Sequence, residues 1–244
     1  MANAWTGGTT ATGSSASTLA DIIGRVRGYL DDTTGDEDSY GWPSVELTGY
    51  LNESVNELCR KLRLIEDADT AAICTHALLA NGHTLTLSPR ITGIERVELN
   101  STGAVLIVVD HVRDMDARFP GWKSADASVP QYLIKNGLGT LKARVYPATL
   151  LADTINLTVH RLPLADLDWD ADQASEPEIP STYHDPLYYG ILARAYRKHD
   201  VDTENNRLAG DFEKKWEDRV EEIRKAHLHK ETVPHTAAPA EGWM

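Results

Sequence analysis

Apolar residues recur at helical spacing in the stretch from Gly41 to Leu64. Their separation of three or four positions is that of one face of an amphipathic helix. The residues on this face are Leu47, Leu51, Val55, Leu58, Leu62 and Ile65. Trp42 stands where a hydrophobic staple residue would stand, and Ser44 is the expected N-terminal cap. The pattern therefore predicts a long helix with one buried face.

Two other segments show the same periodicity. Residues 19–30 carry an apolar stripe, and either Ser17 or Thr18 can cap the helix that this stripe predicts. Near the other end of the chain, residues 203–230 carry one apolar face among many charged side chains. This second segment predicts a long helix that is exposed over most of its circumference.

The middle of the chain has the pattern of short strands. Between about residue 70 and residue 163, β-branched segments alternate with turn residues. Residues 130–147 predict a hairpin around Asn136 and Gly137, and residues 155–159 alternate between apolar and polar. This part of the chain predicts an antiparallel sheet module, either a small sandwich or a barrel.

Helical spacing returns at residues 184–200, where Asp185 is the expected cap and Pro186 the expected first helical residue. The apolar faces of the early and late helices need partners, so we expect them to pack together. The predicted fold class is α+β: a bundle of about four helices, two N-terminal and two C-terminal, with an inserted antiparallel β-sandwich or barrel-like module. The expected divisions are a flexible N-terminal arm at 1–17, a helical bundle domain at 18–66 and 182–230, a β-rich insertion module at 67–181, and a C-terminal tail at 231–244.

Composition narrows the classes of function. The chain has 244 residues, 41% of them hydrophobic, and a formal net charge of −13. This charge argues against a nucleic-acid reader, which needs Lys and Arg to neutralise phosphates. It suits a surface that DNA passes without adhering, although solubility is the simpler explanation.

We expect no membrane span and no secretory signal. Cys59 and Cys74 form no disulfide framework and are expected to be buried thiols.

Two acidic segments are candidates for chemistry. Asp110, His111, Asp114 and Asp116 lie close together in sequence, but strand alternation would separate the carboxylates from the histidine, which favours a polar loop. The alternating aspartates at 166–172 resemble a calcium loop, yet this segment lacks the glycine and the final glutamate of such a loop. A solvated acidic loop is therefore favoured there. We expect no catalytic residue, no metal site and no cofactor.

The C-terminal tail offers candidates for partner binding. Trp243 has no local core to join, so it is either an anchor that enters a partner's pocket or part of a disordered end. The candidate partner-binding residues are Pro234, His235, Ala237, Pro239 and Trp243.

Several weak motifs in a fixed order carry a family resemblance. Trp42 and Pro43 precede the helix "YLNESVNELCRKLRL", "VYP" follows the strands, and "EIPSTYHDPLYYGILARAYRK" leads to a charged helix containing "FEKKW". From Asp21 to Lys230 this order resembles head-to-tail adaptor proteins (connector, or head-completion, proteins) of tailed bacteriophages. A large β-module and a long Gly/Ser/Thr arm depart from the family pattern. They leave open whether the chain is an adaptor ring proper or a relative of the tail nozzle.

The resemblance implies a structural virion protein of the neck region, with no enzymatic activity. Its expected partners are the portal protein, a tail or nozzle protein, and copies of itself in a ring, expected to be a dodecamer. Genomic DNA would pass through the channel of the ring without sequence-specific binding, and no membrane would be involved. Two alternatives remain at this point: a non-enzymatic module on a helical stalk that binds carbohydrate or protein, and a phage cell-wall hydrolase.

Overall fold

The computed structural model describes residues 17–33, 41–135, 141–198 and 205–231, with side chains up to residue 226. The chain divides into two compact units, one comprising Met1–Ser54 and Leu167–Arg219, the other Val55–Asp166 and Val220–Met244. The observed fold is α+β, as predicted.

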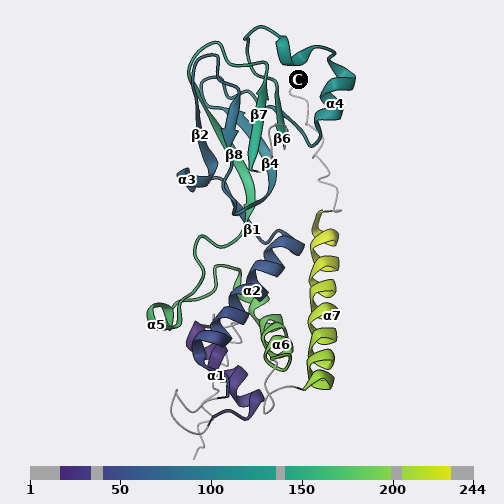
Figure 1. Ribbon diagram of the computed structural model, residues 1–244. Helices are drawn as coiled ribbons and strands as arrows, with labels where there is room; N and C mark the ends of the chain where they lie inside the picture. Colours follow the sequence, from purple (N-terminus) through teal and green to yellow (C-terminus); the bar gives the residue numbers. More distant parts are fainter. Residues whose placement is uncertain (1–16, 34–40, 136–140, 199–204, 232–244) are drawn as a thin grey trace, which may run out of the picture. The chain divides into compact units, whose positions relative to one another are not determined.

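Helices make up the first unit (Figure 1). Each of the four expected helical segments is a helix, and the elements are α1 (Leu19–Leu30), α2 (Ser44–Leu62), α5 (Trp169–Asp172), the 3-10 turn η3 (Ser181–Tyr183), α6 (His184–Ala195) and α7 (Asn206–Glu231). The last part of α2 and the last part of α7 are assigned to the second unit.

The starts of these helices agree only in part with the predicted caps. Thr18 caps α1, and its side chain and that of Asp21 form a reciprocal capping box. The other two predictions are wrong. Helix α2 begins at Ser44 itself, because the carbonyl of Pro43 accepts the first helical hydrogen bond. Helix α6 begins at His184, since the turn η3 leads directly into it, and this places Asp185 inside the first helical turn.

The second unit contains two sheets. Its elements are β1 (Ile65–Asp67), α3 (Ala71–Cys74), β2 (Thr75–Leu78), β3 (Thr84–Thr86), β4 (Ile91–Leu99), β5 (Ile107–Val109), α4 (Val112–Arg118), the 3-10 turn η2 (Trp122–Ser124), β6 (Tyr132–Lys135), β7 (Lys142–Tyr146) and β8 (Asp153–Arg161). In one sheet the long strand β8 pairs with β4 and with the short strands β1 and β2. The other sheet has the order β3-β7-β6-β5.

Among the described residues, the strand pairs other than β5–β6 are antiparallel. The expected hairpin is formed by β6 and β7, while its turn at Asn136 and Gly137 lies outside the described residues. Strands β5 and β6 are parallel, against the prediction. A parallel pair needs a long connection, and residues 110–131, with α4 and η2, provide one.

One hydrophobic cluster receives side chains from both sheets. Val97, Leu133 and Leu157, from β4, β6 and β8, are almost completely buried within it. A smaller cluster lies around α4 and η2, where Met115 and Trp122 pack with Ile134 of β6. Cys59 and Cys74 are both buried, as expected. Among the described residues, no helix is both long enough and apolar enough to cross a membrane.

Candidate docking surface

The residues predicted to bind a partner lie outside the part of the chain that the structure describes. Pro234, His235, Ala237, Pro239 and Trp243 all fall within 232–244. Their role in binding a partner therefore stays a prediction.

The first acidic segment is helical rather than the expected loop. Val112, Met115 and Phe119 are spaced three and four residues apart, and they pack in the cluster beside β6, which explains why α4 forms. Asp110 forms an ion pair with Lys135 (Nζ to Oδ1, 3.0 Å), and this hydrogen bond lowers the pKa of the Asp110 carboxyl. The Asp110 carboxylate therefore belongs to a surface ion pair at the end of β6.

The second acidic segment forms a short capped helix, α5. The Asp168 carboxylate accepts a hydrogen bond from the Asp170 amide (3.1 Å), and the Asp172 carboxylate accepts one from the Asp168 amide (3.0 Å). The side chain of Asn52 donates a hydrogen bond to the carbonyl of Leu167 and accepts one from its amide. These two bonds hold the residue that precedes the cap of α5. Within the described ranges, no three His, Cys, Asp or Glu side chains are grouped so that they could hold a metal ion.

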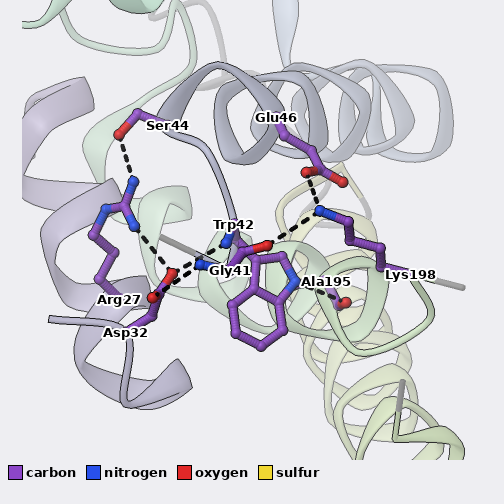
Figure 2. Close-up of polar contacts among 8 residues, drawn as sticks. All are labelled: Arg27, Asp32, Gly41, Trp42, Ser44, Glu46, Ala195 and Lys198. Carbon is purple, nitrogen blue, oxygen red and sulfur yellow. Dashed lines mark hydrogen bonds and ion pairs between the residues drawn. The ribbon is translucent and has the colours of Figure 1, made fainter. Parts of the chain in front are cut away.

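A polar network joins α1, α2 and α6 at one end of the first unit (Figure 2). The buried guanidinium of Arg27 donates to the Ser44 hydroxyl (2.6 Å) and forms an ion pair with Asp32 (3.2 Å). The Asp32 carboxylate also accepts hydrogen bonds from the amides of Gly41 and Trp42. Asp32 therefore binds the chain on both sides of segment 34–40.

The same network reaches the end of α6. The indole Nε1 of Trp42 donates to the carbonyl of Ala195 (3.0 Å), while Lys198 donates to Glu46 (2.7 Å) and to the carbonyl of Gly41 (3.1 Å) (Figure 2). Trp42 also contacts the ring of Tyr196 edge to face. These contacts connect three helices to one another, so we interpret the network as a structural joint.

The second unit has a groove with exposed apolar side chains. Its volume is about 260 Å³, and we call it the distal groove. It is lined by Leu99, Ser101, Thr102, Ser128, Val129, Pro130, Thr149, Leu150, Leu151, Ala152 and Asp153. The side chains of Val129, Leu150 and Leu151 are 55%, 57% and 76% exposed. Large apolar side chains that gather in one exposed place commonly mark an interaction surface.

Strand β8 locates the distal groove within the module. Asp153 at the start of β8 lines the groove, whereas Arg161 at its end pairs with Ile65, where the chain arrives from α2. A strand of nine residues is roughly 30 Å long. The groove therefore lies at the end of the module opposite to its two connections with the rest of the chain.

Sequence reasoning missed this surface. The available signal was the doublet Leu150-Leu151, which lies between two predicted strands and beyond a proline, where turn residues are expected. The other apolar lining residues come from segments around Leu99 and Val129, far away in the sequence. The pairing of β4 with β8 and the bridge between Ser128 and Thr149 bring these segments together.

Comparison with known proteins identifies the family of the chain. A search of curated proteins finds no significant match, whereas the family model described as SU10 adaptor protein matches residues 17–238. The match covers most of the chain, including both helical parts and all the strands, and it confirms the resemblance to phage adaptor proteins. The chain belongs to the SU10 adaptor protein family.

Proposed function

We propose that this protein is a structural virion protein that forms a ring below the phage portal, extends the DNA channel and docks the next neck or tail component. The observation that carries the proposal is the match of an adaptor family model to residues 17–238. Its partners are then the portal protein, a tail or nozzle protein and further copies of itself, with a dodecamer as the expected ring.

The packing of the helices supports a bundle as the body of such a ring. Helix α6 lies between α2 and α7 (Figure 1), and Gly190 lets the side chains of Ser54 and Trp216 approach its backbone closely. Arg25 of α1 lies over the ring of Tyr188 at 4.3 Å and donates to its hydroxyl. We propose that these helices form one bundle domain (18–66 and 182–230) that carries the sheets as a sandwich-like insertion (67–181).

Two different units suit ring assembly. A contact between neighbours in a ring is heterologous, because each subunit presents one surface to the copy before it and another to the copy after it. A chain with a helical unit and a β-rich unit has two chemically different surfaces for this purpose. In the proposal, the β-module faces outward or toward the tail.

Net charge supports the proposed relation to DNA. A formal charge of −13 opposes adhesion of phosphate groups, which is what a channel for genome passage requires.

The tail carrying Pro234, His235, Ala237, Pro239 and Trp243 would dock on the portal or on a neighbouring subunit, since a segment that cannot fold alone can become ordered on a partner.

A binding measurement tests the proposal. Mass photometry of the full chain mixed with the portal of its own phage should show portal complexes heavier by the mass of a complete ring of 26.9 kDa subunits. A portal whose mass stays unchanged at micromolar concentrations of the chain would refute the proposed portal binding.

A further inference from the structure

The distal groove is preformed by hydrogen bonds among the three segments that line it. Ser101 donates to the Asp153 carboxylate through its hydroxyl (2.6 Å) and its amide (3.2 Å). The Thr149 hydroxyl donates to the carbonyl of Leu151 (2.6 Å), and the Ser128 amide donates to the carbonyl of Ala148 (2.8 Å). A groove held in this way needs little reorganisation to bind a partner, which favours affinity.

The lining of the groove favours an occupant that is largely apolar. Asp153 is its single charged residue, and its carboxylate already accepts hydrogen bonds from Ser101 and from the Thr154 amide. With no Lys or Arg in the lining, the groove has nothing to neutralise a phosphate, so nucleic acid does not fit it. Leu150 and Leu151 instead offer apolar surface that gains free energy when water is removed from it.

The C-terminal segment 232–244 of this chain has the matching chemistry. Glu241 is the only Asp, Glu, Lys or Arg in this segment, and most of the other residues are Ala, Pro, Val, Trp or Met. Pro234 and Pro239 lack amide hydrogens and favour an extended backbone, which lies well in a groove. Trp243 provides a large aromatic anchor of the kind that dominates binding energy.

Length also fits. Thirteen residues follow the last described residue, Glu231, and they can extend about 45 Å. In a ring every copy carries both a tail and a groove, so a tail that binds the next copy's groove makes a heterologous contact that repeats around the ring.

We propose that residues 232–244 of one copy bind in the distal groove of a neighbouring copy, with Trp243 seated against Leu150 and Leu151. This inference rests on the ring that is proposed above, and it names the neighbouring subunit as the partner of the tail. The tail would then lock each subunit to the next at the end of the β-module that is farthest from its connections.

Site-specific photo-cross-linking tests this contact in the full chain. The variants Leu151→p-benzoylphenylalanine and Val129→p-benzoylphenylalanine carry the probe in the groove, at positions exposed enough to leave folding unchanged. A matched control carries the probe at Val45, which is 60% exposed on α2. Equal amounts of ¹⁴N- and ¹⁵N-labelled chain are mixed, assembled with the portal, irradiated and mapped by mass spectrometry.

The expected result is that groove probes, unlike the Val45 probe, cross-link to residues 232–244 and give mixed-isotope products. In this assay Trp243→Ala should lower the yield about tenfold or more, whereas Thr232→Ala, at the far end of the tail, should leave it unchanged. Tail cross-links confined to single-isotope products would overturn the assignment to a neighbouring copy.

Electron microscopy of the same samples separates this inference from the proposed function. If rings form on the portal but the groove probes cross-link to another segment, to the portal, or not at all, the tail-in-groove contact is overturned. The adaptor function would still stand. Absence of rings on the portal would overturn both.

Discussion

Asp67 of β1 and Arg161 of β8 form a buried ion pair, with 7% and 6% of the two residues exposed. The pair ties the first strand of the β-module to its last. Burial alone would raise the pKa of the Asp67 carboxyl, but hydrogen bonds from Thr70, Arg161 and the Asp69 amide outweigh it and lower the pKa well below its usual range. The carboxylate is therefore charged in the folded protein.

This pair predicts that the protein loses stability in acid. Because the pKa of Asp67 is lower in the folded state than in the unfolded chain, its stabilising contribution is complete above about pH 4. That contribution falls as the pH drops from there through the folded pKa, since the unfolded state binds the proton more readily. Urea unfolding followed between pH 2 and pH 7 should show this decline.

The variant Asp67→Asn tests the assignment. It leaves the guanidinium of Arg161 buried without its carboxylate, so the free energy of unfolding at pH 7 should fall by about 3–5 kcal/mol. Its dependence on pH below 4 should also be shallower than that of the parent chain. The exposed neighbour Glu66→Gln should change stability by less than about 0.5 kcal/mol. Equal stability of Asp67→Asn and the parent would show that the pair contributes nothing.

Close packing between helices predicts a strong effect at Gly190. A Cβ atom there would lie 2.7 Å from Ser54 Oγ and 3.2 Å from Trp216 Cε3. Gly190→Ala should therefore destabilise the protein by about 1–3 kcal/mol through overpacking. Gly49→Ala on α2 meets nothing within 4 Å and should be neutral or stabilising by up to about 1 kcal/mol. Thermal unfolding of both variants compares them, and the same melting temperature for the two would contradict this account of α6.

The joint in Figure 2 predicts that Asp32 matters more than its neighbour Asp31. Asp32→Ala removes the acceptor for Arg27 and for the amides of Gly41 and Trp42, so the free energy of unfolding should fall by about 1–3 kcal/mol. Asp31 is exposed and adopts a left-handed conformation (φ 56°) that asparagine tolerates, so Asp31→Asn should be nearly neutral. Urea unfolding curves that coincide for the two variants would refute the joint.

The proposed role of the tail predicts a separation of assembly from folding. Deletion of residues 231–244 removes the candidate docking residues but none of the buried side chains described here, so circular dichroism and melting temperature should match those of the full chain. Attachment to filled heads should be lost. Truncated protein that still joins filled heads would rule out docking through the tail.

Local chemistry predicted the helices better than the strands. The stripe from Leu47 to Leu62 and the cap at Thr18 depend on residues that are neighbours in sequence, and the structure agrees with both. Ser44 could not be assigned correctly in the same way, because its hydroxyl accepts a hydrogen bond from Arg27, which lies on another helix.

Contacts between residues that are far apart in the sequence explain most of the features that the sequence did not predict. Helix α4 forms because Met115 is buried against β6, and no alternation within 110–116 reveals that partner. The parallel pairing of β5 with β6 and the distal groove likewise depend on strands that meet only in the fold. The role of the candidate binding residues in the tail depends on a partner that the chain itself does not contain, and it stays a prediction.

The most direct test of the adaptor function is negative-stain electron microscopy of the full chain, alone and mixed with the portal of its own phage. The account predicts particles with axial symmetry, either rings of the chain alone or an added ring below each portal. Monomers in both samples, with portals that are identical with and without the chain, would contradict it.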